Sequence, residues 1–220
     1  MSVVVTADVG VGRPRRPLVF ATRNQGKLVE LRHLLPDNMV LSIDEAQQQL
    51  GICIAEVDED ADTFVGNAAK KAREVSAATG LPALADDSGL CVAALAGAPG
   101  VYSARFAGPN ADDAANNAKL LSELAAVPAA QRTAHFCCTL VLADVRGALG
   151  DAIITADGMC AGEILRAARG SEGFGYDPLF LVTALGQTFA ELDVERKSEL
   201  SHRARAMRAI APQLQAYLAR

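Results

Sequence analysis

The segment Leu81-Pro82-Ala83-Leu84-Ala85-Asp86-Asp87-Ser88-Gly89-Leu90 places two adjacent carboxylates inside an apolar run that extends to Leu95. A buried, ionised carboxylate is costly unless a cation or hydrogen bonds stabilise it. One interpretation is therefore a functional site that uses at least one of the two aspartates. The other is a turn between strands at 81–84 and 90–95, because Asp-Asp-Ser-Gly is favourable turn chemistry. The spacing alone leaves both interpretations open.

Composition limits the protein class. The chain has 220 residues, of which 50% are hydrophobic and 21% charged, as in an ordinary globular protein. The formal net charge of −5 argues against a broad nucleic-acid-binding surface, and no apolar stretch is long enough to span a membrane. We therefore expect a cytoplasmic protein that has neither a nucleic-acid nor a membrane partner.

Five cysteines are present, an odd number with no Cys-x-x-Cys pair. Free thiols in a reducing compartment are the expected state, and no zinc site is expected from this spacing. Residues 1–17 place their arginines after the short apolar run at 3–5, the reverse of a signal peptide. A flexible N-terminal tail at 1–17 is predicted, followed by a single domain at 18–220.

The pattern of the chain alternates between strands and helices and then becomes strand-rich. Strands are predicted at 18–22, 40–43, 52–54, 136–143, 153–156 and 179–182. Helices are predicted from Lys27, at 63–79, from Ala111 to about Ala125 with Asn110 as the cap, and near the C-terminus, where Pro212 should kink or interrupt the helix. An acidic loop occupies 56–62, and another extended stretch ends near Ile164. This order predicts an α/β fold with a mixed sheet.

The first strand-to-helix corner, around Thr22, Asn24, Gly26 and Lys27, has the form of a phosphate site. Backbone N–H groups and the helix dipole at such a corner attract anions. It is not a Walker A loop, because the first glycine is missing and Leu28 replaces the required Ser or Thr. An ordinary turn with a solvated lysine is the commoner arrangement.

Two further patches carry candidate chemistry. In the glycine-rich stretch 170–178, Phe174 could stack on a base, or Phe174 and Tyr176 could pack into the core. Lys197, His202 and Arg203 gather near the start of the last helix, where cations oppose the helix dipole unless an anion binds. A nucleoside polyphosphate with Mg²⁺ would use these patches, the phosphate corner and the paired aspartates together.

Five segments in order resemble the inosine-triphosphatase-like family, the house-cleaning pyrophosphatases for dITP and XTP. They are residues 22–27, 85–90, 97–100 with 103–105, 173–178, and Lys197 with 201–203. The resemblance implies an elongated mixed β-sheet with flanking helices and two lobes around a central active-site cleft. It also implies a homodimer, a Mg²⁺ requirement, and hydrolysis of purine nucleoside triphosphates (ITP, dITP, XTP) to monophosphate and pyrophosphate.

The resemblance also implies residue roles. Asp87 would be the catalytic base and a Mg²⁺ ligand. Asp86 would support the site or the metal, and Glu59, favoured over Asp58, would be the second ligand. The substrate would be bound by Thr22, Arg23, Asn24, Gln25, Gly26, Lys27, Ser88, Phe174, Gly175, Tyr176, Asp177, Lys197, His202 and Arg203.

The sequence departs from the family pattern at Gly66, where the family usually has Glu, and in the acidic loop. Loss of that Glu removes one member of a capping box with Thr63 and is expected to weaken the helix start. Two alternatives remain open: a pyrophosphatase for other damaged nucleotides, and a nucleotide-binding sensor that has lost catalysis.

Overall fold

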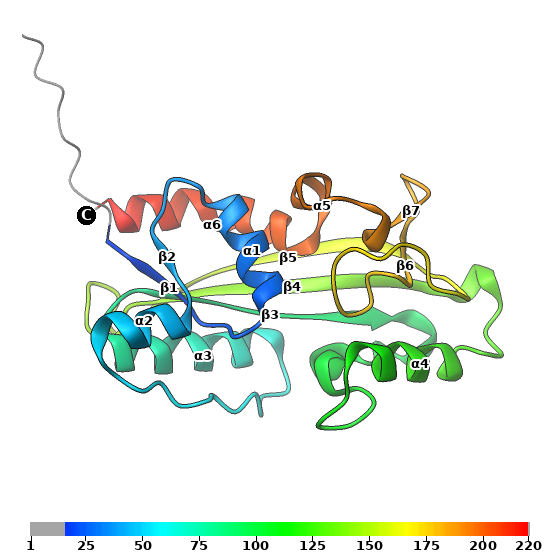
Figure 1. Ribbon diagram of the computed structural model, residues 1–220, viewed down its shortest axis with the longest axis horizontal. Coiled ribbons are helices and arrows are strands. Elements are labelled where there is room, and N and C mark those ends of the chain that lie inside the picture. Colours follow the sequence, from blue (N-terminus) through cyan, green and yellow to red (C-terminus); the bar gives the residue numbers. More distant parts are fainter. Residues whose placement is uncertain (1–15, 220) are drawn as a thin grey trace, which may run out of the picture.

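A seven-stranded mixed sheet forms the centre of the protein, as seen in a computed structural model that describes residues 16–219 (Figure 1). The strand order is β2-β1-β3-β4-β5-β6-β7. β1 pairs in parallel with β2 and β3, and every later pairing is antiparallel. The strands are β1 (Leu18–Phe20), β2 (Val40–Leu41), β3 (Ala83–Val92), β4 (Thr133–Ala143), β5 (Ile153–Ile164), β6 (Phe180–Val182) and β7 (Gln187–Thr188). The predicted α/β class with a mixed sheet is confirmed.

Helices cover both faces of the sheet, with α1 and α6 on one side and α3 on the other (Figure 1). One core cluster packs α1 and α6 against Leu84 and Leu140, and a second packs α3 against Ala85 and Val141. The change of face between neighbouring residues follows from the period of two in a strand. The helices are α1 (Gln25–Leu34), α2 (Ile43–Leu50), α3 (Phe64–Thr79), α4 (Asp113–Glu123), α5 (Val194–Leu200) and α6 (His202–Leu218).

The predicted turn at Asp86-Asp87 is wrong, because β3 runs without a break from Ala83 to Val92. Asp86 lies opposite Leu140 and Asp87 opposite Thr139 in the ladder with β4. The hydrogen bonds and side-chain packing of a strand paired over its whole length stabilise the chain more than the local turn preference of Asp-Asp-Ser-Gly does. The two aspartates therefore lie in the middle of a strand, with their side chains on opposite faces.

Other boundaries also differ from the prediction. Ser42 caps α2 through a complete capping box with Glu45, so the predicted strand at 40–43 ends at Leu41 and a helix follows. Residues 52–54 form no strand. Asp112, not Asn110, caps α4, and α6 continues through Pro212 without interruption. The strands predicted at 153–156 and up to Ile164 are one strand, β5.

The predicted tail falls mostly outside the described residues, which begin at Arg16. Arg16 itself donates to the buried Asp144 carboxylate at 2.8 Å, and the Tyr217 hydroxyl donates to the same oxygen at 2.6 Å. This end of the predicted tail is therefore anchored. Among the helices of residues 16–219, none has the length and apolar character needed to cross a membrane.

Candidate active site

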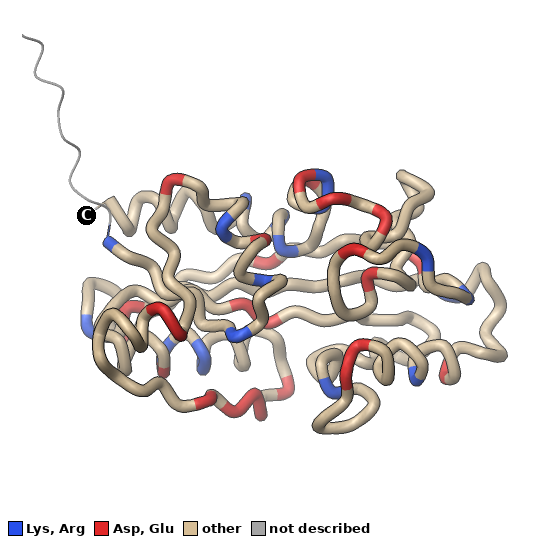
Figure 2. The backbone as a smooth tube through the Cα atoms, in the orientation of Figure 1, with Lys and Arg blue, Asp and Glu red and all other residues tan. Residues whose placement is uncertain are grey.

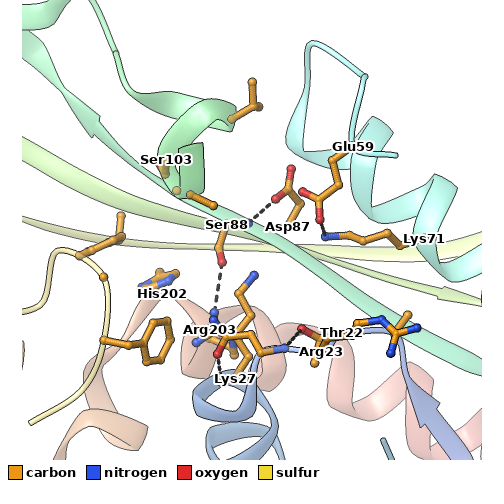
Figure 3. A pocket seen from close by; sticks show the side chains of 18 of the residues that line it. Thr22, Arg23, Lys27, Glu59, Lys71, Asp87, Ser88, Ser103, His202 and Arg203 are labelled. Carbon is orange, nitrogen blue, oxygen red and sulfur yellow. Dashed lines mark hydrogen bonds and ion pairs between the residues drawn. The ribbon is translucent and has the colours of Figure 1, made fainter. Parts of the chain in front are cut away.

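A cavity of about 330 Å³ lies where the β1–α1 corner, β3, α3 and the start of α6 meet (Figure 3). Sixteen different residues are expected at the substrate or the metal, and fourteen of them line this cavity. Thr22, Arg23, Asn24, Lys27, Glu59, Asp87, Ser88, Phe174, Gly175, Tyr176, Asp177, Lys197, His202 and Arg203 line the cavity. Gly26 and the exposed Gln25 are not among the lining residues.

The β1–α1 corner presents the start of a helix to this cavity. Asn24 caps α1 by accepting a hydrogen bond from the Lys27 backbone N–H at 3.0 Å, and its own N–H donates to Thr22 Oγ1 at 3.2 Å. Arg23 is held to one side by Asp44 at 3.1 Å and by the Ile54 carbonyl. The first-turn amides and the positive end of the helix dipole therefore face the cavity, as an anion site requires.

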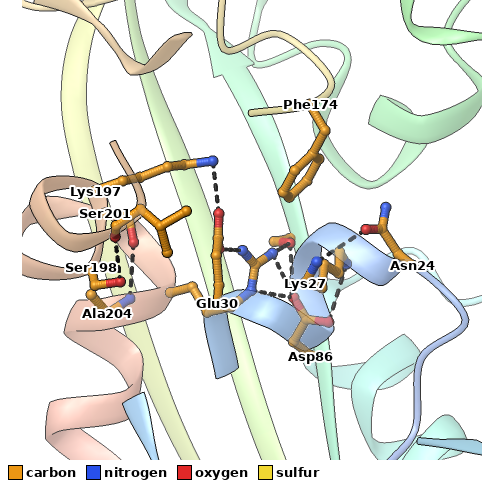
Figure 4. A network of polar contacts seen from close by, with 12 residues as sticks. Asn24, Lys27, Glu30, Asp86, Phe174, Lys197, Ser198, Ser201 and Ala204 are labelled. Carbon is orange, nitrogen blue, oxygen red and sulfur yellow. Dashed lines mark hydrogen bonds and ion pairs between the residues drawn. The ribbon is translucent and has the colours of Figure 1, made fainter. Parts of the chain in front are cut away.

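Asp86 is the centre of a buried ion-pair network on the α1–α6 face (Figure 4). Lys27 Nζ lies 3.1 Å from Asp86 Oδ1, and Arg203 Nη2 and Nε donate to Oδ2 at 2.9 and 3.1 Å. The Ser88 hydroxyl donates to the same oxygen at 3.1 Å. Burial alone would raise the pKa of Asp86, but Lys27 and Arg203 outweigh it and hold the pKa well below its usual range.

The network continues through Glu30, which no sequence motif indicated as a site residue. Glu30 is paired with Arg203 and lies 2.7 Å from Lys197 Nζ, which also contacts Asp177 at 2.6 Å. Burial opposes ionisation of Glu30, yet Arg203 and Lys197 lower its pKa. The expected substrate-binding residues Lys197 and Arg203 are thus fixed by carboxylates before any ligand binds.

Asp87 faces the opposite side of the sheet, toward α3. Its carboxylate accepts hydrogen bonds from Asn67 Nδ2 at 3.0 Å and from the Ser88 backbone N–H at 2.9 Å. Burial, assisted by the nearby Glu59 charge, raises the pKa of Asp87 to about 6, although Lys71 and Asn67 act in the other direction. A carboxylate with a pKa near neutral is suited to accept a proton from water.

Lys71 is a site residue that the sequence analysis missed. It lies in the middle of α3, where a lysine side chain is usually solvated. Here the residue is only 8% exposed, and its Nζ contacts Glu59 Oε1 at 2.9 Å. The charges of Asp86, Glu59 and Asp87 overcome burial and raise the pKa of Lys71. Its position on the α3 stripe, one helical turn after Asn67, was the available signal.

The Asp87–Glu59 pair fits a magnesium ion. Both carboxylates line the cavity, whereas Asp58 does not (Figure 3). Mg²⁺ typically takes one or two carboxylates and fills its remaining positions with water and substrate phosphates. A cation between these two carboxylates would oppose the effect of the Glu59 charge, which raises the pKa of Asp87.

The two aromatic residues of the glycine-rich loop differ in their surroundings: one packs into the core and the other faces the cavity. Tyr176 is 4% exposed and donates its hydroxyl to the Ser103 carbonyl at 2.8 Å, so it is largely a core residue. Phe174 stays partly exposed in the cavity, with Lys197 Nζ 4.5 Å from its ring centroid. A Cβ at Gly26 would lie 2.6 Å from Phe174 Cδ1, so this glycine allows the ring to pack over the start of α1.

His202 begins α6 as a buried, neutral group. Burial, together with Arg203 and Lys197, lowers its pKa well below the usual value. Its ring stacks on Phe136 at 4.8 Å, and within residues 16–219 its Nδ1 atom has no hydrogen-bond partner. An unpaired polar atom at a cavity wall is available for a ligand.

Gly66 does not disrupt the start of α3. Thr63 caps the helix by accepting from the Gly66 N–H at 3.1 Å. A Cβ at position 66 would lie 2.8 Å from the Ala61 Cβ. The glycine thus allows the acidic loop to pack closely on the helix, and the predicted weakening of the cap is limited to the missing Glu side chain.

Comparison with known proteins agrees with this arrangement. The family model of the Ham1 family matches residues 18–213. The chain is 53% identical over 193 residues to a dITP/XTP pyrophosphatase of Desulforamulus reducens, covering 87% of this chain and 92% of the relative. It is 52% identical to a dITP/XTP pyrophosphatase of Geobacter sulfurreducens over 86% of this chain and 92% of the relative.

Solved structures of Ham1 proteins have the same fold as this chain. A HAM1 protein from Coxiella burnetii superposes with a TM-score of 0.79 at 40% identity, covering 91% of this chain and 99% of that chain. The Ham1 protein of Staphylococcus aureus gives a TM-score of 0.77 at 36% identity, with 92% and 100% coverage. Sequence and structure together show that the chain belongs to the Ham1 family.

Proposed function

We propose that the protein is a Mg²⁺-dependent nucleoside-triphosphate pyrophosphatase that hydrolyses dITP, ITP and XTP to the monophosphate and pyrophosphate. The observation that carries the proposal is the difference in surroundings between the two adjacent aspartates. Asp86 is neutralised by Lys27 and Arg203, whereas Asp87 faces the cavity with its pKa raised to about 6. The relatives at about half identity are named dITP/XTP pyrophosphatases, which supports the same reaction.

The triphosphate would lie along the positive wall of the cavity. The first-turn amides of α1 and the Lys27 side chain supply donors there, and Lys71 supplies a second charge from α3. Asp86 already orients Lys27, Glu59 orients Lys71, and Glu30 orients Lys197. Little side-chain entropy of these lysines is therefore lost when the phosphates bind.

Asp87 would accept the proton of the attacking water. The oxygen of that water forms a bond to the α-phosphorus, and its proton passes to the Asp87 carboxylate. The bond between the α-phosphorus and the bridging oxygen to the β-phosphate breaks, so that oxygen leaves with pyrophosphate. Asn67 and the Ser88 N–H fix the orientation of that carboxylate.

Asp87 and Glu59 would hold Mg²⁺. The ion, when bound, would neutralise charge that develops on the phosphate oxygens. In addition, it would keep Asp87 ionised at neutral pH, because a nearby cation favours the charged form of a carboxyl group.

The base would lie against Phe174, near His202. A neutral His202 whose Nδ1 carries the proton would donate to the 6-oxo oxygen of hypoxanthine or xanthine. At that position adenine carries an amino group, which would leave the buried donor unpaired. This supports discrimination against ATP.

A product assay tests the proposal. Purified protein is incubated with dITP, ITP, XTP, ATP and GTP, with and without Mg²⁺, and pyrophosphate and orthophosphate are measured separately. Pyrophosphate from dITP, ITP and XTP, only in the presence of Mg²⁺, is expected. Release of orthophosphate, or equal rates with ATP, would contradict it. The homodimer stays a prediction, and sedimentation of the purified protein measures it.

A further inference from the structure

A second group of chemically reactive side chains lies outside the active-site cavity, on β3 and β4. Cys91, His135 and Cys137 each offer one ligand atom, and these atoms all lie within 4.8 Å of one another. All three side chains are partly exposed, so an ion in solution can reach them.

The sheet register brings the three residues together. Cys91 lies directly opposite His135 in the antiparallel ladder of β3 and β4, and Cys137 follows two positions later on the same strand. Side chains at directly paired positions, and at i and i+2, project from one face of a sheet. The absence of a Cys-x-x-Cys pair had argued against a zinc site, but that spacing applies to loops and not to ligands from two strands.

We propose that Cys91, His135 and Cys137 form a binding site for Zn²⁺ on this face of the sheet.

The donor set suits zinc. Two thiolates and an imidazole are typical Zn²⁺ ligands, whereas Mg²⁺ prefers oxygen. Tetrahedral bonds of about 2.3 Å to sulfur and 2.0–2.1 Å to nitrogen separate ligand atoms by roughly 3.5–3.8 Å. Atoms within 4.8 Å of one another therefore need only small side-chain rotations to reach that geometry.

The two sulfur atoms already approach each other, because a hydrogen bond joins the Cys91 and Cys137 side chains. Met159 lies opposite Cys137 in the β4–β5 ladder and is 52% exposed, so its side chain projects from the same face of the sheet as the three ligands. Zn²⁺ binding would release the thiol protons to solvent.

A disulfide between the two cysteines is the competing outcome. Cys91 and Cys137 are diagonal, not directly opposed, in the ladder. Diagonal positions have Cα atoms about 7–8 Å apart, whereas a disulfide usually needs about 4.4–6.8 Å. Metal ligation bridges the two sulfurs without moving the strands together.

The test titrates the reduced, full-length protein with Co²⁺ in the presence of excess Mg²⁺, which occupies oxygen-ligand sites. We expect thiolate-to-cobalt charge-transfer absorbance that saturates at one ion per chain and disappears when Zn²⁺ is added. Cys53→Ser, at an exposed cysteine outside the group, and Asp87→Asn, in the active site, should leave this signal unchanged.

Loss of a residue that only hydrogen-bonds to a metal ligand costs roughly 10–100-fold in metal affinity. Cys91→Ser and Cys137→Ser each remove a ligand, so each should weaken Co²⁺ binding by more than this. His135→Asn should weaken Co²⁺ binding as well. Circular dichroism confirms that each variant is folded. Absence of the absorbance in the wild-type protein, or equal absorbance in Cys91→Ser and Cys53→Ser, would overturn the proposal. Formation of a Cys91–Cys137 disulfide by a protein whose reduced form binds no metal would also overturn it.

Discussion

Asp86 and Asp87 are consecutive residues of β3, yet their carboxylates lie on opposite faces of the sheet and their pKa values move in opposite directions. Lys27 and Arg203 stabilise the charge of Asp86, whereas Asp87 is buried beside Glu59. The period of two in a strand is what allows neighbouring residues to have such different surroundings. One aspartate can therefore organise the site while the other remains available to react.

Asp86→Asn should destabilise the protein strongly. The change leaves the buried Arg203 without its main carboxylate partner, and breaking a buried pair on one side costs about 3–5 kcal/mol. Urea unfolding at pH 7.5 measures the loss. Asp60→Asn, which removes an exposed pair with Lys70, is the matched control and should leave the unfolding midpoint unchanged. An equal effect of both changes would contradict the assigned role of Asp86.

Asp87→Asn should have an effect on stability that depends on pH. In the metal-free folded protein Asp87 binds a proton up to about pH 6, whereas the unfolded chain releases it near pH 4. Wild-type stability therefore falls as the pH rises through this interval, and the asparagine variant lacks that loss. The free energy of unfolding of the variant should rise relative to wild type by about 2 kcal/mol between pH 4.5 and 7.5.

Urea unfolding in EDTA at the two pH values measures this difference. A difference that does not change with pH would show that the pKa of Asp87 is close to its ordinary value. The variant itself serves as the internal reference, because its amide does not titrate.

Gly26→Ala should impair nucleotide binding more than folding. The new Cβ would lie 2.6 Å from Phe174 Cδ1, and the ring would have to move away from the start of α1. Loss of base stacking is worth about 1–3 kcal/mol, so KM for dITP should rise about 5- to 150-fold. Val29→Ala, at an exposed position of the same helix, should leave KM unchanged. An unchanged KM in Gly26→Ala would place the base elsewhere.

Gly66→Ala should not give the usual stabilisation of about 1 kcal/mol for replacing a helical glycine by alanine. The added methyl group would lie 2.8 Å from Ala61 Cβ and 2.9 Å from Thr63 Oγ1, so the acidic loop or the cap must shift. Thermal unfolding of this variant is compared with that of Val65→Ala, at an exposed position in the same turn. A clear gain for Gly66→Ala would show that the acidic loop yields without cost.

The sequence predicted which motifs meet more accurately than it predicted the elements that hold them. Asp87, Lys27, Phe174 and Arg203 lie at one cavity, as the ordered motifs indicated. The turn at Asp86-Asp87 was wrong, because local turn preference does not reveal that β4 pairs with the whole of β3.

The residues that were missed share a physical reason. Glu30 and Lys71 are charged residues within helices, where the common expectation is a solvated side chain. Their burial becomes evident only when the helices pack beside Arg203 and Glu59. Helix α2 was missed for a different reason. The Ser42–Glu45 capping box is present in the sequence, but the prediction places Ser42 in a strand at 40–43 and Glu45 in no element.

The most direct measurement of the central claim compares pyrophosphate release from dITP by the wild-type protein and by Asp87→Asn, with saturating Mg²⁺ and with nucleotide binding measured in parallel. Loss of a general base reduces turnover by about 10²–10⁴-fold, and this loss is predicted here with dITP still bound. Turnover by Asp87→Asn within tenfold of the wild-type rate would contradict the assignment of Asp87 as the base.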